Sequence, residues 1–245
     1  EIIPTRNHSE IMLNNMGALI ERKGDKIVVY PLKSKLKSID ISVPSDPSSS
    51  AFFAGLAVIS NNSKLKLTNV LLNESRIGFV EVLKRMNCLV KKSNESIHNG
   101  EKVGDLTFRS SNLKAIEVES KIIPSIIDEI PILAVIAAFA KGTTVFNNVE
   151  ELKYKECDRL RAIIHNLKAF GIKTYENNNN LFVEGGRIKK MAEITTFDDH
   201  RIAMAFTILS LTSFKKYKLD NKECVDISLP NFFKYLSEVT KWDLL

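Results

Sequence analysis

Five charged side chains crowd into residues 153–159, immediately before an apolar helical pattern begins. Glu156 is a carboxyl group that can donate and accept protons, and its cationic neighbours Lys155 and Arg159 lower a carboxyl pKa and attract anions. A solvated carboxylate in the first turn of a helix, favoured by the helix dipole, explains the same pattern without any chemistry. From the residues alone, both interpretations stay open.

Charged groups also stand at the starts of two other predicted helices. Asp128 precedes an apolar run over residues 130–140, and His200 and Arg201 open a helical pattern over residues 198–213. Asp128 suits the N-terminal cap of its helix as well as a chemical role, and a lone histidine is more often structural than catalytic. Arg201 suits an anion, because its planar fork binds a carboxylate or phosphate through two hydrogen bonds.

The helices that carry these groups belong to a repeating order of elements. Residues 48–111 read as an apolar helix, a strand, an amphipathic helix and two strands, and residues 128–186 repeat that order. A third copy has a helix at residues 198–213, a strand at 216–219 and a helix at 229–242, and it lacks the closing strands. Residues 6–32 match only a second helix and its strands, with a turn at residues 23–25. The pattern predicts a mixed α/β fold, with apolar helices buried on several sides.

Three arginines occupy similar positions in these units. Arg6 and Arg76 each lie ten residues before a methionine, and Arg159 lies eleven residues before Phe170, so each falls near the start of a second helix. Helix N-termini carry unpaired N–H groups and partial positive charge. A common rim that faces anions therefore explains the three arginines better than coincidence in a basic protein.

The composition limits the class of protein. The chain has 245 residues, of which 44% are hydrophobic and 26% charged, as in an ordinary globular protein. Its net charge of +6 permits an anionic ligand. The lysines are dispersed, and no aromatic residues alternate with them, so no nucleic-acid partner is expected. The longest apolar run, residues 130–140, is too short to span a bilayer, so no membrane helix is expected.

Cysteine, histidine and glycine patterns predict neither a metal site nor a cofactor. Cys88, Cys157 and Cys224 are far apart and form no CxxC pair, and the four histidines have no ligand spacing. Neither a P-loop nor a GxGxxG fingerprint occurs, so no nucleotide cofactor is expected. Unpaired cysteines fit a reducing cytoplasm. Because the first residue is Glu1, we expect the chain to start inside a longer protein.

Four segments carry a resemblance to a known enzyme family. They are VPSDPSSSAFFAG (43–55), IIDEIPILAVIAAFAKGTTVFNNVEELKYKECDRL (126–160), DDHRIAMAF (198–206) and TRNHSEIMLNNMGA (5–18). In order and spacing they resemble the C-terminal half of 5-enolpyruvylshikimate-3-phosphate synthase, and they are most similar to its bacterial class II branch. The resemblance runs almost from end to end of the chain.

This resemblance implies a fold and a domain organisation. The family's enolpyruvyl transferase fold has two similar domains, each an inside-out α/β barrel of three βαβαββ units around buried helices. Residues 1–43 would then be the last piece of the N-terminal-side domain, and residues 44–245 a near-complete second domain. The missing N-terminal half of the same enzyme would be a partner of this chain, and the fragment alone is expected to be inactive.

The implied reaction transfers the enolpyruvyl group of phosphoenolpyruvate to the 5-hydroxyl of shikimate 3-phosphate, with release of phosphate. It belongs to aromatic amino-acid biosynthesis, and glyphosate is the family's inhibitor. The hydroxyl attacks C2 while C3 gains a proton, and phosphate then leaves as C3 loses a proton. The site therefore needs a group that exchanges the C3 proton, a base for the hydroxyl, and cations that neutralise the two substrates.

The resemblance assigns catalytic roles to four residues. Glu156 is expected to exchange the C3 proton, and Asp128 to act as the base for the 5-hydroxyl and to position the sugar ring. Lys155 is expected to reach the shikimate phosphate or the hydroxyl region. His200, beside Arg201 at a helix start, is a further catalytic candidate.

The remaining expected substrate contacts come from arginines. By the resemblance, Arg159 and Arg201 bind phosphoenolpyruvate, and Arg6 contacts the shikimate 3-phosphate from the other domain. Ser48 and Ser49 are expected to cap a helix rather than to bind substrate.

Two positions depart from the family pattern. Ser45 stands where the family usually has glycine, which would stiffen the crossover between domains. Cys157 stands where serine is common; a thiol at a helix N-terminus is sometimes acidified and reactive, but we expect it to be an inert small residue.

Two other functions remain open at this point. One is a related transferase that adds enolpyruvate to UDP-N-acetylglucosamine, although its cysteine loop is not found in this sequence. The other is a non-catalytic basic module that binds RNA or a partner protein, whose affinity would fall steeply with salt.

Overall fold

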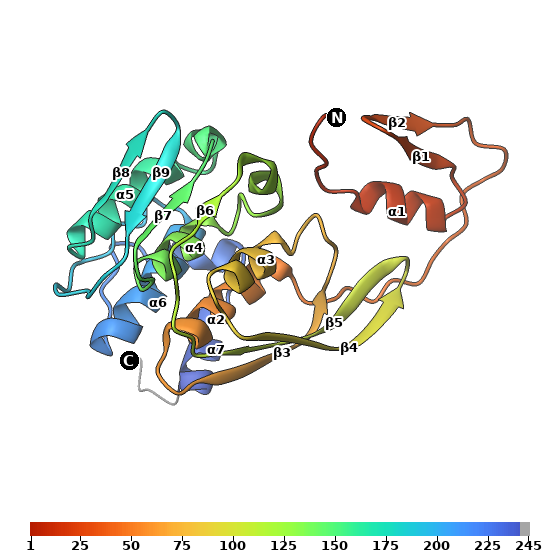
Figure 1. Ribbon diagram of the computed structural model, residues 1–245. Coiled ribbons are helices and arrows are strands. Elements are labelled where there is room, and N and C mark those ends of the chain that lie inside the picture. The colour runs from red at the N-terminus through yellow and green to blue at the C-terminus, as the bar shows by residue number, and fades with distance from the viewer. Residues whose placement is uncertain (241–245) are drawn as a thin grey trace.

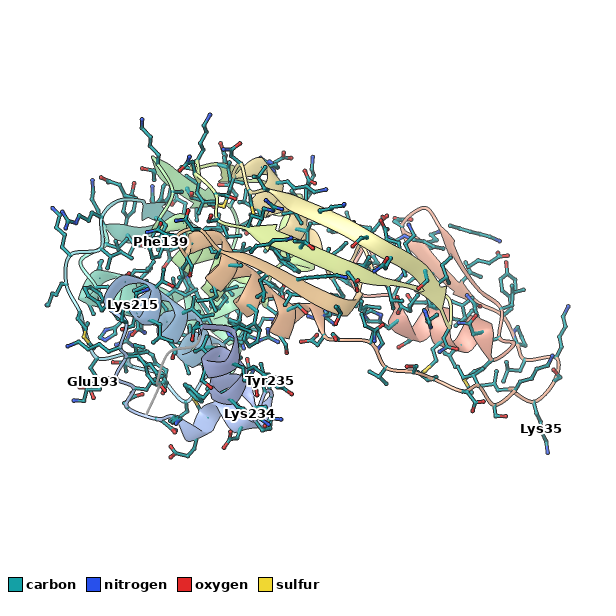
Figure 2. The ribbon with its side chains drawn as sticks, turned by 90° about the horizontal axis from the view of Figure 1, so that it is seen from below. Lys35, Phe139, Glu193, Lys215, Lys234 and Tyr235 are labelled. Carbon is teal, nitrogen blue, oxygen red and sulfur yellow. The ribbon has the colours of Figure 1, made fainter. Side chains whose placement is uncertain are left out.

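The computed structural model describes residues 1–240 of the chain. Its first elements are α1 (His8–Asn15) and an antiparallel hairpin of β1 (Ile20–Lys23) and β2 (Lys26–Val29), which turns at Gly24 and Asp25 as predicted. These elements lie at one end of an elongated molecule, joined to the rest by an extended segment (Figure 1). Lys35 marks the far tip of this end in Figure 2.

The first full unit confirms the predicted order of elements. It consists of α2 (Pro47–Ile59), β3 (Lys64–Leu71), α3 (Gly78–Arg85), β4 (Val90–His98) and β5 (Glu101–Arg109). The three strands form an antiparallel sheet in the order β3-β5-β4. The tip of the β4–β5 hairpin extends toward the N-terminal elements (Figures 1 and 2).

The second unit repeats the first with additions that the sequence did not reveal. The predicted elements are α4 (Ile130–Ala137), β7 (Thr143–Phe146), α5 (Arg159–Ala169), β8 (Thr174–Asn177) and β9 (Asn180–Glu184). The additions are β6 (Glu117–Val118) and two 3-10 helices, η1 (Ser120–Ser125) and η2 (Glu150–Tyr154). The four strands form one sheet in the order β6-β7-β9-β8. Asn178 and Asn179 adopt positive φ at the β8–β9 turn, as asparagine tolerates in tight hairpins.

The third unit is the least complete. It holds α6 (His200–Phe214), η3 (Glu223–Ile227) and α7 (Phe232–Thr240). The strand predicted over residues 216–219 is wrong: only an isolated bridge joins Ile194 and Leu219. The helix predicted over residues 229–242 begins at Phe232, and its last two positions lie outside the described residues.

Three apolar helices form the centre of the core. Every residue of α4 is buried, twelve of the thirteen residues of α2 are buried, and α6 is buried from Ile202 to Leu211. These helices pack on one another, as expected of helices that are hydrophobic all round. Over residues 1–240, no helix combines the length and the apolar character needed to cross a bilayer.

Capping differs from what the sequence suggested, and the difference frees side chains for the site. Ser48 and Ser49 do not cap α2; the cap is Asp46, whose carboxylate accepts the backbone N–H of Ser49 at 2.8 Å. Asp128 does not cap α4 either, because Glu129 occupies that position and makes no side-chain cap. Local propensity favours any Ser or Asp near a helix start, whereas the tertiary partners of these residues decide otherwise.

Candidate active site

Asp128 gathers three arginines from distant parts of the chain. Its Oδ2 accepts a hydrogen bond from Arg6 Nη2, its Oδ1 lies 3.2 Å from Arg159 Nη1, and Arg201 Nη2 lies 3.7 Å from Oδ2. Arg6 precedes α1, Arg159 opens α5, and Arg201 stands in the first turn of α6. The packing of α4 against α5 and α6 therefore brings Asp128, Arg159 and Arg201 together. Arg6 reaches the same carboxylate from the segment before α1.

Arg159 is the most buried member of the cluster. Its side chain is fully buried, and Nε donates to Asp199 Oδ2 at 2.7 Å, while Nη2 donates to Glu156 Oε2. Because Asp158 caps α5 by accepting the N–H of Arg161, the helix begins at Arg159 and directs its first side chain inward. A buried guanidinium of this kind requires ionised partners, and here three carboxylates supply them.

The arginines dominate the electrostatics of Asp128. Burial by itself would raise the pKa of Asp128, but Arg201, Arg6 and Arg159 outweigh it and lower the pKa to about 2. The carboxylate is therefore ionised at neutral pH and is a weak base while the arginines hold it.

The charged residues that precede α5 divide into two groups. Glu156 faces Arg159 and keeps 49% of its side chain exposed, so solvent or a ligand reaches it. Lys155 is not part of the Asp128 cluster, since its ammonium group bonds to Glu151. Lys153 bonds to Glu176 at 2.7 Å and is likewise turned away. Residues adjacent in sequence thus point to different partners.

The start of α6 supplies an arginine and a buried histidine. Arg201 Nη1 donates to the backbone carbonyl of Asp128 at 3.2 Å, whereas its buried Nε has no acceptor among the described residues. His200 is buried, and burial together with the neighbouring Arg201 lowers the pKa of its imidazole. His200 is therefore neutral at neutral pH, a hydrogen-bonding group rather than a cation.

A second network, which the sequence did not reveal, adjoins Asp128. Glu129 is 3% exposed and accepts a hydrogen bond from the Ser48 hydroxyl. Ser48 Oγ in turn accepts from Arg76 Nη2 at 3.0 Å, and Arg76 also pairs with Asp46 at 2.9 Å. The equivalence of Arg76 to Arg6 and Arg159 in the repeats was the one sequence signal for this network.

Cys157 lies next to this cluster and is not acidified. Burial, together with a contact to Asp199 in which Sγ lies 3.6 Å from Oδ2, raises the pKa of the thiol to about 12. The thiol is thus protonated at neutral pH, which agrees with an inert role.

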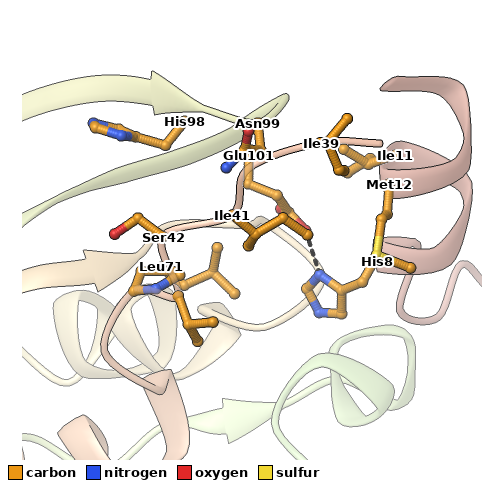
Figure 3. Close-up of a pocket in the computed structure, with 12 residues that line it drawn as sticks. His8, Ile11, Met12, Ile39, Ile41, Ser42, Leu71, His98, Asn99 and Glu101 are labelled. Atoms are coloured by element: carbon orange, nitrogen blue, oxygen red, sulfur yellow. Dashed lines mark hydrogen bonds and ion pairs between the residues drawn. The ribbon is translucent and has the colours of Figure 1, made fainter. Parts of the chain in front are cut away.

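An apolar cavity of about 170 Å³ lies elsewhere, beside the extended segment that joins the two ends of the molecule (Figure 3). Ile11 and Met12 of α1 and Ile41 of the segment contribute to its lining, and His8 lies there in contact with Glu101. Its apolar lining does not suit an anionic substrate, so we assign the chemistry to the Asp128 cluster.

The arrangement around Asp128 holds three arginines and three carboxylates, namely Asp128, Glu156 and Asp199. An entering anion can replace a carboxylate as the partner of one or more guanidinium groups. Such an exchange would release Asp128 and Glu156 from their cationic partners and raise the basicity of Asp128 where the anion binds.

Comparisons with known proteins agree on one family. The family model described as EPSP synthase (3-phosphoshikimate 1-carboxyvinyltransferase) matches residues 1–236. A 3-phosphoshikimate 1-carboxyvinyltransferase of Clostridium tetani is 44% identical over 240 residues, and one of Thermoanaerobacter sp. (strain X514) is 41% identical over 234 residues. These alignments include 97% and 96% of this chain, but 54% and 55% of the relatives. The chain thus spans about half the length of the curated relatives it matches.

Solved structures agree in fold. An EPSP synthase of Acinetobacter baumannii superposes with a TM-score of 0.88 at 34% identity, over 96% of this chain and 55% of that one. The enolpyruvyl transferase NikO of Streptomyces tendae superposes with a TM-score of 0.70 at 16% identity, over 93% of this chain and 51% of that one, which supports the fold alone. The mixed α/β, enolpyruvyl transferase fold expected from the sequence is therefore confirmed.

Proposed function

Since this chain belongs to the EPSP synthase (3-phosphoshikimate 1-carboxyvinyltransferase) family, we propose that it is part of an enzyme that transfers the enolpyruvyl group of phosphoenolpyruvate to shikimate 3-phosphate and releases phosphate. The observation that carries this proposal is the convergence of Arg6, Arg159 and Arg201 on the single carboxylate of Asp128. Guanidinium groups so arranged suit a small, highly charged anion.

Phosphoenolpyruvate would bind where the three arginines meet. Arg159 and Arg201 would hold its carboxylate or phosphate, in place of their present carboxylate partners. The contact of Arg6 with the same Asp128 supports assigning Arg6 to this anion, rather than to the shikimate 3-phosphate that the sequence suggested. The resident charges balance, since three carboxylates face the three arginines, so further cations would be needed from the missing half of the enzyme.

Asp128 and Glu156 would perform the proton transfers. Asp128 is held ionised by its arginines in the free protein and gains basicity when a substrate anion takes over those arginines. Glu156 pairs with Arg159, and an anion that takes over this arginine would free its carboxylate. Glu156, the more exposed of the two, would exchange the C3 proton, and Asp128 would accept the proton of the 5-hydroxyl and orient the sugar.

Shikimate 3-phosphate would bind next to this cluster. Arg76 extends the rim of arginines, and its hydrogen bond to Ser48 supports a second anion corner there. Lys155 would contribute after it leaves Glu151. We assign His200 a smaller role, as a neutral hydrogen-bonding group beside Arg201.

The proposal extends to the organisation of the enzyme. Residues 1–43 would complete the N-terminal-side domain, and residues 44–245 would form most of the second domain. The active enzyme would need the missing N-terminal half, because the chain aligns with only about half the length of each of these relatives. We also assign it to the cytoplasm, as its free cysteines suggest, and expect glyphosate to inhibit it.

The test is phosphate release by the complete gene product that contains this chain. We expect inorganic phosphate to appear only when phosphoenolpyruvate and shikimate 3-phosphate are both present, and glyphosate to suppress it. UDP-N-acetylglucosamine in place of shikimate 3-phosphate serves as the control for the related transferase. Phosphate release with UDP-N-acetylglucosamine alone as acceptor would refute the proposal, and so would the absence of reaction with both acceptors.

A further inference from the structure

Asp128 and Glu129 are consecutive carboxyl groups in opposite surroundings. Asp128 faces three arginines, whereas Glu129 is 3% exposed and has no ion pair within residues 1–240. Its partner is a neutral hydroxyl, that of Ser48. Burial raises the pKa of Glu129 to about 7, against the lowering effects of Ser48 and Arg201. When the surroundings of two carboxyl groups push their pKa values apart in this way, the two groups often have different functions.

Ser48 connects Glu129 to the rim of the site. Its hydroxyl donates to Glu129 Oε1 and accepts from Arg76 Nη2 at 3.0 Å. The Arg76 side chain is 13% exposed, and its Nη2 also reaches Asp46 at 2.9 Å. The guanidinium group is therefore fixed from the inside by Ser48 and from the outside by Asp46.

We propose that Glu129 is a positioning residue, which holds Ser48 and through it Arg76 in place for a phosphate-bearing substrate and takes up a proton when that anion binds. The inference rests on the proposed function, which supplies the anion. Neither the resemblance to known enzymes nor the helix-start pattern assigns Glu129 a role.

The proton uptake follows from the hydrogen bonds. In the free protein, an ionised Glu129 accepts the Ser48 proton, so this hydroxyl is not available to a ligand. A phosphate beside Arg76 offsets part of the positive charge that favours an ionised Glu129, and it adds negative charge nearby. Glu129 then binds a proton from solvent, and the resulting carboxyl O–H donates a hydrogen bond to Ser48 Oγ. The Ser48 hydroxyl can then rotate and donate its own hydrogen bond to the phosphate.

Among Glu129 and the groups that face it, only Glu129 changes its charge near neutral pH. The facing groups are Ser48 of α2, Arg76 before α3, Arg201 of α6 and Asp128 in its own turn. The arginines stay protonated throughout the accessible range, and the pKa of Asp128 is about 2. A change of charge at this position between pH 6 and 8 therefore belongs to Glu129.

The experiment counts protons on binding. The complete gene product is titrated with shikimate 3-phosphate by calorimetry at pH 8, in buffers of different ionisation enthalpy. Protons taken up by the substrate's own phosphate contribute equally to all variants, so differences between variants isolate Glu129. We expect wild type to take up more protons than Glu129→Gln, by up to about one per site. The matched control is Glu150→Gln, at an exposed glutamate, which should keep the wild-type count.

A second variant approaches the same group from its partner. Ser48→Ala removes the hydrogen bond that lowers the pKa of Glu129, so a larger fraction of Glu129 is protonated before the substrate arrives and the extra uptake falls. Affinity supplies an independent readout: Glu129→Gln should bind within a few-fold of wild type, because an amide replaces a neutral carboxyl, and Glu129→Ala should bind about tenfold more weakly or worse.

The outcomes separate the two proposals. If wild type neither binds shikimate 3-phosphate nor releases phosphate, the proposed function fails. If wild type does both and either Glu129→Gln or Ser48→Ala keeps the wild-type proton count, the role of Glu129 is refuted. A purely structural Glu129 would change affinity and stability and leave the count unaltered.

Discussion

Arg159 and Asp199 form an ion pair in which both side chains are fully buried, with Nε 2.7 Å from Oδ2. Asp199 also caps α6 by accepting the backbone N–H of Arg201 at 2.8 Å. One carboxylate thus fixes both the guanidinium at the start of α5 and the helix that carries Arg201. The site and the core share this contact, which explains why a charge is tolerated among buried helices.

Removing the charge of Asp199 should destabilise the protein strongly. Asp199→Asn keeps an N-cap of similar quality but leaves Arg159 without its buried counter-charge, so we expect a loss of about 3–5 kcal/mol in the free energy of unfolding. Urea unfolding measures it. The comparison variant is Asp158→Asn, which changes a cap outside the buried pair; an equal loss in both variants would contradict the special role of the Arg159 contact.

Acid should weaken the cluster through Asp128. Its pKa is lowered in the folded state to about 2 from an ordinary 3.8, so its contribution is complete above pH 4 and disappears as the pH falls toward 2. The shift corresponds to about 2 kcal/mol. We expect the free energy of unfolding, measured in urea, to be higher for wild type than for Asp128→Asn by at least this amount at pH 6. The difference should shrink as the pH falls toward 2. A difference that is independent of pH would rule out this assignment.

Glu156 should matter for the rate and little for stability. Its side chain is 49% exposed, whereas loss of a proton-transfer group typically costs 10²–10⁴-fold in rate. We therefore expect Glu156→Gln in the complete enzyme to lower kcat by about this range, with unfolding close to wild type. Phosphate release measures the rate, and Glu150→Gln is the matched control. A normal turnover for Glu156→Gln would remove it from the mechanism.

Cys157 should resist alkylation. With a thiol pKa of about 12, it presents more than a hundredfold less thiolate at pH 7.5 than a free cysteine with a pKa near 8.5. We expect iodoacetamide to label it far more slowly than glutathione in the same tube, as followed by mass spectrometry of the Cys157 peptide. Rapid labelling of that peptide would instead indicate the acidified thiol that its position at a helix start suggested.

Gly78 should be required where α3 meets η1. A Cβ at this position would lie 2.1 Å from Ser125 Oγ and 2.8 Å from Ile126 Cγ2. Gly78→Ala must therefore push apart the turns that carry Arg76 and Asp128. We expect a loss of about 1–3 kcal/mol in unfolding free energy and a higher KM for shikimate 3-phosphate in the complete enzyme.

Two further variants test whether contact is the cause at Gly78. Gly186→Ala is the control, since nothing lies within 4 Å of a Cβ there, and it should be close to neutral. Ser125→Ala removes the nearest clashing atom and should restore part of the loss in Gly78→Ala. If the double variant is no better than Gly78→Ala, the explanation from close packing is wrong.

The local elements, and the chemical types of the residues at their starts, follow from the amino-acid sequence alone. Apolar helices such as residues 130–140 must be buried whatever surrounds them, and the asparagines at 177–180 favour a tight turn through their tolerance of positive φ. These properties depend on neighbours along the chain, which explains why the first two units were predicted in order. The failed strand at 216–219 had only four residues to signal it, too few for a reliable periodicity.

Which charged groups meet depends on how the helices pack in three dimensions. Lys155 and Glu156 are neighbours in sequence, yet one bonds to Glu151 and the other to Arg159. Ser48 looked like a helix cap and is instead the partner of Glu129, 81 residues away. Ionisation depends on burial and on partners brought together by helix packing, and neither is encoded in local spacing. Asp128 and Glu129 are consecutive in the sequence, and packing alone gives them opposite pKa shifts.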